Sequence, residues 1–149
     1  MRIVVADDEP DLLEFYRGAL ARLGHTVVAA AKTGNELIEQ CRSTCPDLIV
    51  TDIKMPELDG IEAAARIYRA APIAVIVVSG CHDAEYITRA QQNHVLAYLV
   101  KPVVETQLAA AIAIAITRFE EFQALRQEAA DLRQTSQNGK SSNEPKASS

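Results

Sequence analysis

Five short apolar segments rich in β-branched residues recur along the chain, and each is followed by a stretch with helical periodicity. These segments span residues 3–6, 27–30, 48–51, 74–78 and 97–100. Some of them, such as Val75-Ile76-Val77-Val78, are apolar without alternation, which is typical of strands that are buried on both faces. The alternation predicts an α/β fold in which helices cover both faces of one parallel sheet.

The segments between the predicted strands carry helix start and stop signals. Gly24 suits the left-handed position just after the end of the first helix. Thr33 or Asn35 is expected to cap the second helix. A later helix is expected over 83–93, where Asn93, which tolerates left-handed backbone geometry, would end it. These signals divide the chain into helices of ordinary length.

The last predicted helix is the exception in length. Residues 105–133 contain no Gly or Pro, and apolar side chains recur there every three or four positions. At about 1.5 Å per residue this helix is longer than one sheet of this size can cover. Residues 134–149 have too little apolar surface to offset the entropy of ordering. We therefore predict a domain over 1–118, a helical extension over 119–133 and a disordered polar tail over 134–149.

The charge of the chain argues against two classes of partner. The 149 residues carry a formal net charge of −5, whereas binding to nucleic acid or anionic lipid needs a basic surface. No apolar run is long enough for a signal peptide or a membrane span. Three cysteines are too few and too scattered for a disulfide framework and are expected to be packing thiols. We expect a cytoplasmic protein that binds neither membranes nor nucleic acid directly.

Polar side chains stand at the carboxyl ends of four predicted strands. The first strand ends in Asp7-Asp8, the third in Asp52, the fourth in Ser79 and the fifth in Lys101. Open parallel sheets bind ligands at this edge. Clustered carboxylates repel one another unless a cation bridges them, and a small set of oxygen ligands favours Mg²⁺. A metal and a lysine beside a carboxylate nucleophile suit phosphoryl transfer.

Each of these residues alone has a simpler explanation. An aspartate at a strand end often caps the next helix, a serine there often forms a turn, and a lysine is often a solvated charge. Their joint placement at one edge of one predicted sheet is what favours a functional site over these separate explanations.

Four motifs carry these residues. They are Ile3-Val4-Val5-Ala6-Asp7-Asp8-Glu9-Pro10, Leu48-Ile49-Val50-Thr51-Asp52-Ile53-Lys54-Met55-Pro56-Glu57-Leu58-Asp59-Gly60, Val77-Val78-Ser79-Gly80 and Tyr98-Leu99-Val100-Lys101-Pro102. Together they resemble the receiver domains of bacterial response regulators in two-component signalling, over nearly the whole of residues 1–118. The resemblance implies a flavodoxin-like, doubly wound parallel sheet of five strands in the order 2-1-3-4-5.

The resemblance also implies a role for each acidic residue. Asp52 would accept a phosphoryl group from a histidine kinase or a phosphotransfer protein. Asp7 and Asp8 would hold Mg²⁺ together with Asp52 and the backbone carbonyl of Lys54. Such a domain catalyses at most its own phosphorylation and dephosphorylation, and it signals through contact with a downstream protein.

The same resemblance assigns the switching residues. Ser79 would hydrogen-bond the aspartyl phosphate, Lys101 would pair with it, and Pro102 would follow a cis peptide bond that directs the lysine inward. On phosphorylation Ser79 would move toward the phosphate and Tyr98 would turn inward. A simple packing aromatic at a strand end is the alternative explanation of Tyr98.

The long last helix is similar to the linker of regulators in which a receiver continues into a small RNA-binding antiterminator module, but a polar tail follows here where that module would begin. An apolar stripe runs along this extension: Phe119, Phe122, Leu125, Ala129 and Leu132. Its contact with water is unfavourable. We expect either a helix pair between two copies of the chain or folding of the stripe onto its own domain, and the spacing is not a clean heptad.

Two other functions compete with signalling by a receiver. A small Mg²⁺-dependent phosphatase or phosphotransferase would use Asp52 as a nucleophile on diffusible substrates, but such enzymes generally need a second acid and a cap that excludes water. A pure interaction module that is never phosphorylated would have no use for the acidic cluster.

Overall fold

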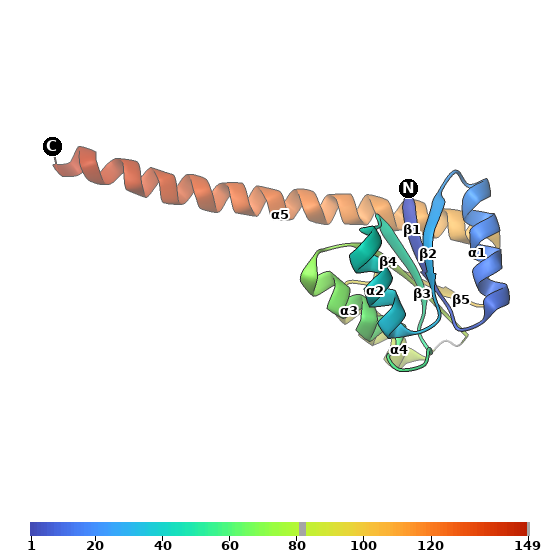
Figure 1. Ribbon diagram of the computed structural model, residues 1–149. Coiled ribbons are helices and arrows are strands. Elements are labelled where there is room, and N and C mark those ends of the chain that lie inside the picture. Colours follow the sequence, from blue (N-terminus) through green and yellow to red (C-terminus); the bar gives the residue numbers. More distant parts are fainter. Residues whose placement is uncertain (81–82, 149) are drawn as a thin grey trace. The chain divides into compact units, whose positions relative to one another are not determined.

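A single parallel sheet forms the centre of the fold, with strands in the order β2-β1-β3-β4-β5 (Figure 1). The computed structural model describes residues 1–80 and 83–134 in full, and the backbone of residues 135–148. The strands are β1 (Arg2–Ala6), β2 (Thr26–Ala31), β3 (Leu48–Asp52), β4 (Ala74–Ser79) and β5 (Ala97–Val100). Both the five predicted strands and their predicted order are confirmed.

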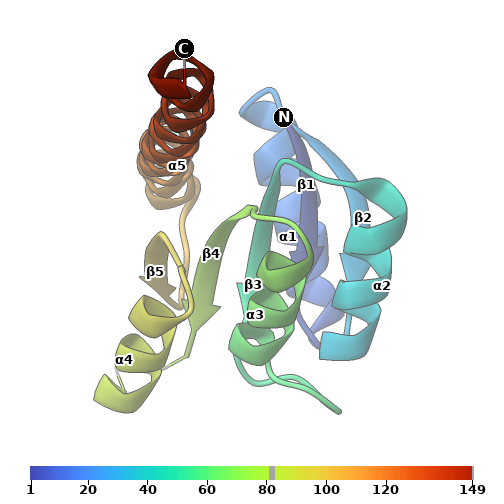
Figure 2. The same ribbon diagram turned by 90° about the vertical axis from the view of Figure 1, so that its left-hand side faces the viewer.

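A helix follows each strand, as the periodicity predicts. The helices are α1 (Pro10–Arg22), α2 (Gly34–Thr44), α3 (Gly60–Ala70), α4 (Ala84–Gln92) and α5 (Glu105–Ser148). Helices α2, α3 and α4 cover one face of the sheet, and α1 and the first part of α5 cover the other (Figures 1 and 2). The ion pair between Arg22 and Glu105, at 2.6 Å, joins α1 to the start of α5.

Alternation along the central strands supplies both halves of the core. One set of strand residues packs with α2, α3 and α4, and it includes Val4, Ala6, Ile49, Val75 and Val77. The residues between them are equally buried and alternate to the other face of the sheet, among them Ile3, Val5, Val50, Ile76 and Val78. A strand that must be apolar on both faces reads as an unbroken apolar run, which explains the pattern seen in the sequence.

The helix ends bear out two predictions and correct a third. The hydroxyl of Thr33 accepts a hydrogen bond from the backbone N–H of Glu36 and so caps α2. Gly24 has a φ of +88° after the end of α1. Asn93 ends α4, but with φ −112°, and the left-handed residue is His94, with φ 64°. With His94 left-handed, the N–H of Val95 donates to the carbonyl of Ala90 at 3.0 Å and closes the helix end, and the His94 ring stacks on Tyr68 of α3 at 4.2 Å between centroids.

The chain divides into two compact units, Met1–Ile116 and Thr117–Ser149. The second unit is the continuation of α5, whose helical backbone runs to Ser148. The predicted disordered tail, 134–149, falls almost entirely on residues whose side chains lie outside the described part, and it stays a prediction. Within the described residues, no helix combines the length and the apolar character that a membrane crossing requires.

The cysteines differ in their surroundings. Cys41 is 6% exposed in the core beneath α2, and burial raises the pKa of its thiol to about 12. Cys45, four residues later, is exposed and ends α2 in a left-handed conformation with φ 49°. Both are free thiols. Because Cys41 is buried and Cys45 is exposed, the prediction of packing thiols is confirmed for Cys41 and is wrong for Cys45. Cys81 lies outside the described residues.

Strand register determines which polar residues meet at the edge of the sheet. Ala6 of β1 is paired with Thr51 of β3, so Asp7 and Asp52 follow side by side. On the other side of β3, Asp52 is paired with Val78 of β4. The carboxyl ends of the central strands therefore bring the acidic residues together at one edge.

Gly60 marks the closest approach between α3 and β3. Its N–H donates a hydrogen bond to the carbonyl of Ile53 at 2.8 Å. A Cβ atom at this position would overlap with the backbone oxygen of Asp52 and would lie 2.8 Å from Oγ1 of Thr51. Any side chain at position 60 would therefore push α3 away from the strand end that carries Asp52.

Replacing this glycine should destabilise the fold. We expect Gly60→Ala to lower the free energy of unfolding by about 2 kcal/mol or more, because overpacking a tight contact costs roughly 1–3 kcal/mol. Gly18→Ala, in the middle of α1, is the matched control, since a Cβ atom there meets only the flexible end of the Arg22 side chain. The control should gain about 0.5–1 kcal/mol. Urea denaturation measures both, and equal stability of Gly60→Ala and the wild type would contradict this packing.

Candidate functional site

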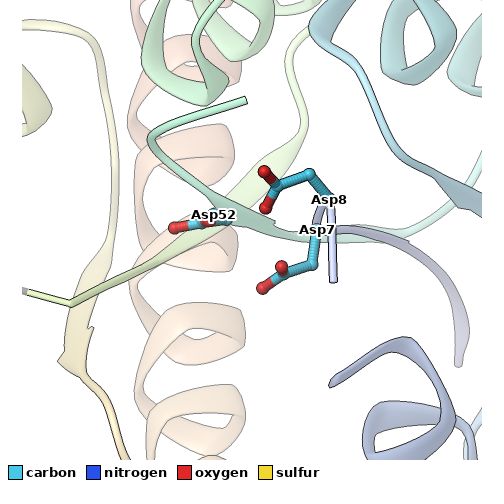
Figure 3. A group of neighbouring side chains, drawn as sticks. All are labelled: Asp7, Asp8 and Asp52. Atoms are coloured by element: carbon cyan, nitrogen blue, oxygen red, sulfur yellow. The ribbon is translucent and has the colours of Figure 1, made fainter. Parts of the chain in front are cut away.

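Three carboxylates converge at the carboxyl edge of the sheet. One oxygen from each of Asp7, Asp8 and Asp52 lies within 4.8 Å of the others, although Asp7 and Asp8 follow β1 and Asp52 ends β3 (Figure 3). Asp7 is fully buried and Asp52 is 6% exposed, whereas Asp8 faces solvent. The cluster is thus buried on one side and open on the other.

Backbone groups hold two of the carboxylates in place. Oδ1 of Asp52 accepts a hydrogen bond from the N–H of Ile53 at 2.8 Å, and Oδ1 of Asp7 accepts one from the N–H of Glu9 at 2.9 Å. The other oxygen of each carboxylate, Oδ2, lies close to the ammonium group of Lys101. These backbone bonds fix the direction of each carboxylate without neutralising its charge.

Lys101 supplies the positive charge of the cluster. Its Nζ lies 3.2 Å from Oδ2 of Asp7 and 3.4 Å from Oδ2 of Asp52. The peptide bond between Lys101 and Pro102 is cis, as the resemblance implies. The backbone N–H of Lys101 donates to the carbonyl of Ser79 at 2.8 Å, which fixes the end of β5 beside β4. The lysine therefore enters the site from the carboxyl end of β5, at the same edge of the sheet as the aspartates.

The environment shifts the pKa values of both partners. Burial raises the pKa of Asp52, the neighbouring carboxylate of Asp7 raises it further, and Lys101 and the N–H of Ile53 act in the opposite direction. Burial alone would lower the pKa of Lys101, but the carboxylates of Asp52 and Asp7 together raise it above its usual value. Lys101 is therefore charged at neutral pH, and it offsets part of the repulsion between the acids.

A crevice of about 370 Å³ opens over the cluster. It is lined by Asp8, Glu9, Asp52, Lys54, Ser79, Gly80 and Lys101. Most of these were singled out in the sequence. Glu9 was not, and its signal was simply its place directly after the aspartate pair. Predicted residues from four strand ends, Asp8, Asp52, Ser79 and Lys101, thus share one solvent-open space, whereas Asp7 is fully buried and does not line it.

Two tyrosines, Tyr98 and Tyr16, lie outside the crevice. Tyr98 of β5 is half-buried against the core under α2, α3 and α4, and it is not among the residues that line the crevice. Tyr16 of α1 is 1% exposed, and its hydroxyl has no hydrogen-bond partner among the described residues. Burial and then Asp7 raise the pKa of Tyr16, which keeps its phenol neutral.

The loop between β3 and α3 is tied to α4. Asp59 caps α3 by accepting a hydrogen bond from the N–H of Glu62 at 2.8 Å. The same carboxylate accepts two hydrogen bonds from one guanidinium nitrogen of Arg89, at 2.9 and 3.1 Å. Lys54, in the same loop, lies 5.8 Å above the ring of Tyr86 in α4. These contacts fix the loop on the α4 side of the site.

The donor set suits a small hard cation. Oδ2 of Asp7 is buried and accepts no well-aligned hydrogen bond from the described residues, although the ammonium of Lys101 is 3.2 Å away. An oxygen in this position still has lone pairs to share. Carboxylate oxygens open to water on one side are typical ligands of Mg²⁺. The residues present therefore fit a divalent ion at this edge.

This fold and this acidic edge define a known class. Residues 3–113 match the family described as the response regulator receiver domain. The chain belongs to that family, whose members act in two-component systems. Receivers of the family bind Mg²⁺ at an acidic pocket of this kind and are generally signalling proteins rather than enzymes.

Curated relatives agree with this assignment. The transcriptional regulatory protein PdtaR of Mycobacterium tuberculosis is 34% identical over 131 residues, which are 88% of this chain and 64% of that protein. A response regulatory protein of Vibrio cholerae is 35% identical over 108 residues, which are 71% of this chain and 41% of that protein. The chain therefore spans less than two thirds of the length of these relatives.

Solved structures show the same architecture. A receiver domain protein from Clostridium thermocellum superposes with a TM-score of 0.74 at 31% identity, covering 81% of this chain and 98% of that one. A CheY-like receiver from Methanospirillum hungatei gives a TM-score of 0.74 at 26% identity, covering 80% and 96%. Each likeness covers about four fifths of this chain.

Proposed function

We propose that this chain accepts a phosphoryl group on Asp52 in a reaction that requires Mg²⁺. The observation that carries the proposal is the convergence of the carboxylates of Asp7, Asp8 and Asp52 within 4.8 Å, beside the ammonium of Lys101. Asp7, Asp8, Asp52 and the backbone carbonyl of Lys54 would hold the ion. When bound, the ion supplies positive charge to the oxygens of the phosphoryl group.

Residues of the chain itself carry out the attack, orient the nucleophile and neutralise charge. A carboxylate oxygen of Asp52 attacks phosphorus, the new O–P bond forms as the N–P bond to the donor histidine breaks, and that histidine nitrogen takes up a proton. The N–H of Ile53 holds the carboxylate in one orientation, which reduces the entropy lost on attack. Lys101 neutralises charge that develops on the phosphoryl oxygens. Positioning and charge neutralisation suffice for this step.

Ser79 and Tyr98 are the proposed switch. Ser79 is 2% exposed at the end of β4 and also lines the crevice, so its hydroxyl is placed to approach a phosphate on Asp52. Tyr98 is half-buried on the neighbouring strand, which leaves a side chain that can move further inward. The resulting change would be read on the surface of α4, β5 and α5.

In this proposal, both the phosphodonor and the downstream partner that recognises the phosphorylated state are proteins. A histidine kinase or a phosphotransfer protein would supply the phosphoryl group, and a downstream protein would recognise the phosphorylated state. The curated relatives are named as regulatory proteins, and that naming supports regulation rather than metabolism. The alternative is a small Mg²⁺-dependent phosphatase or phosphotransferase that uses the same nucleophile.

Phosphorylation by a small donor tests the assignment of Asp52. Incubation with acetyl phosphate and Mg²⁺ should add the mass of one phosphoryl group to the wild type, and EDTA should prevent the gain. Asp52→Asn should show no gain because an amide is a poor nucleophile. Asp11→Asn is the matched control, since Asp11 is an exposed acid in the first turn of α1 outside the cluster, and it should behave as the wild type. Intact mass spectrometry gives the readout.

Two results would count against the proposal. The same mass gain in Asp52→Asn would move the phosphoryl group to another residue. Rapid turnover of p-nitrophenyl phosphate and of unrelated phosphate esters, without a stable mass gain, would favour the phosphatase.

The continuation of α5 is a proposed contact between two copies of the chain. In the unit that begins at Thr117, three large apolar side chains are strongly exposed: Phe122 at 54%, Leu125 at 61% and Leu132 at 65%. Exposed apolar area is unfavourable by about 25 cal/mol per Å². Their spacing along one helix suits a helix pair, in which each stripe covers the other.

A charge placed in the stripe should separate the copies. We expect Leu125→Glu to convert a concentration-dependent dimer into a monomer, because a carboxylate in an apolar helix pair loses its hydration. Gln123→Glu adds the same charge two residues away and should leave the dimer intact. Sedimentation velocity gives both masses, and a monomeric wild type at all concentrations would remove the helix pair.

A further inference from the structure

A second cavity lies between α2 and α3, away from the acidic cluster. It has a volume of about 620 Å³. Its lining residues are Asn35, Ile38, Cys41, Arg42, Cys45, Pro46, Arg66, Ile67, Ala70, Ala71, Pro72 and Ile73. None of them lines the crevice at Asp52. We call this cavity the α2–α3 groove.

The groove stands toward the opposite end of the sheet from the phosphorylation site. Pro46 comes just before β3, and Pro72 and Ile73 come just before β4, at the amino ends of these strands. Asp7 and Asp52, by contrast, mark the carboxyl ends. A ligand in the groove therefore would not compete with a phosphodonor for the same space.

The floor of the groove is continuous with the hydrophobic core. Ile38 of α2 and Ile67 of α3 are half-buried and pack against the core cluster, and Cys41 and Ile73 belong to that cluster. An apolar floor of this kind, in a cavity between roughly 300 and 1,000 Å³, is typical of sites for small molecules. The shape and lining favour a ligand with an apolar body.

The rim of the groove is cationic in a chain whose net charge is −5. Arg42 of α2 and Arg66 of α3 line it from opposite helices, and no Asp or Glu occurs among its lining residues, all of which are described. Arg42 makes no ion pair with any residue that the structure describes. Two guanidinium groups beside an apolar floor complement a carboxylate on an apolar chain.

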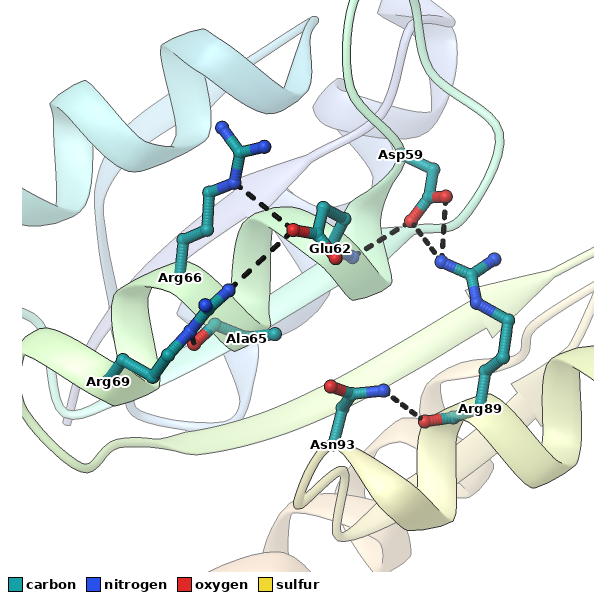
Figure 4. A network of polar contacts seen from close by, with 7 residues as sticks. All are labelled: Asp59, Glu62, Ala65, Arg66, Arg69, Arg89 and Asn93. Carbon is teal, nitrogen blue, oxygen red and sulfur yellow. Dashed lines mark hydrogen bonds and ion pairs between the residues drawn. The ribbon is translucent and has the colours of Figure 1, made fainter.

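Arg66 is held only weakly by its own helix. Its Nε lies 3.2 Å from Oε1 of Glu62, and both side chains are at least 40% exposed. Arg69 approaches the same oxygen at 3.6 Å (Figure 4). Exposed pairs of this kind contribute little to stability. Arg66 can therefore leave Glu62 for a ligand at little cost.

We propose that the α2–α3 groove binds a small amphipathic anion, with its apolar chain against Ile38 and Ile67 and its carboxylate paired with Arg42 and Arg66. The simpler explanation of Arg42 is that it offsets the partial negative charge at the end of α2, where it lies in the last turn. That explanation applies to Arg42 alone. It does not account for Arg66 on the facing helix or for the apolar floor between them.

The test uses the full chain and sodium dodecanoate below its critical micelle concentration. Isothermal titration calorimetry should show saturable binding of one dodecanoate per chain. Dodecyltrimethylammonium, with the same chain and the opposite charge, should bind about tenfold more weakly or worse, as expected when a charge-assisted contact worth about 1.4 kcal/mol is lost.

Two arginines on the same helix form a matched pair of variants. Arg66→Gln should weaken dodecanoate binding about tenfold, because it removes a guanidinium from the rim. Arg69→Gln removes the same charge from α3, beside the same Glu62, but Arg69 does not line the groove. Its affinity should equal that of the wild type. Circular dichroism melting curves show that both variants are folded.

Cys45 reports where the ligand sits. Its thiol is exposed and its residue lines the groove, so bound dodecanoate should slow its alkylation by N-ethylmaleimide, followed by peptide mass mapping. An absence of saturable binding, equal affinity for the ammonium probe, or equal effects of Arg66→Gln and Arg69→Gln would each overturn the proposal. Self-association that Arg66→Gln abolishes, without dodecanoate binding, would assign the groove to a second copy and would also overturn it.

Discussion

The repulsion between carboxylates that parallel strands bring to one edge is the constraint on which the rest of this structure depends. Register places Asp7 beside Asp52, and burial denies them the screening of water. Lys101, held by the end of β5, offsets only part of that charge. The excess of negative charge makes the edge receptive to a divalent cation, and the positive charge of that cation is what a phosphoryl group on Asp52 would need.

Most of the fold could be predicted because its signals are local or strongly periodic. Unbroken apolar runs identified the five strands, and Thr33 and Gly24 marked helix ends as expected. The left-handed residue after α4 was misplaced by one position: it is His94, which follows the cap Asn93 and allows the N–H of Val95 to donate to the carbonyl of Ala90. The stacking of His94 on Tyr68, by contrast, joins segments far apart in the sequence and leaves no local pattern.

The site shows the same division. The residues at the strand ends were predictable because all carboxyl ends of a parallel sheet share one edge. Residues that join the site through packing were not: Glu9 lines the crevice, and Tyr16 has a buried hydroxyl near the acids. The need for glycine at position 60 was also hidden, because it arises from the approach of α3 to the backbone of Asp52.

The central claim is that Asp7, Asp8 and Asp52 form one cation site. Titration with Mn²⁺ in place of Mg²⁺, followed in ¹⁵N–¹H spectra, tests it most directly, because a paramagnetic ion broadens the amide signals nearest to it. The amide signals of the residues that follow Asp8 and Asp52 in the chain should disappear together at the lowest Mn²⁺ concentrations, while those at the end of α3, around Arg69, persist. Broadening that begins at other acidic surfaces and leaves the ends of β1 and β3 sharp would contradict the claim.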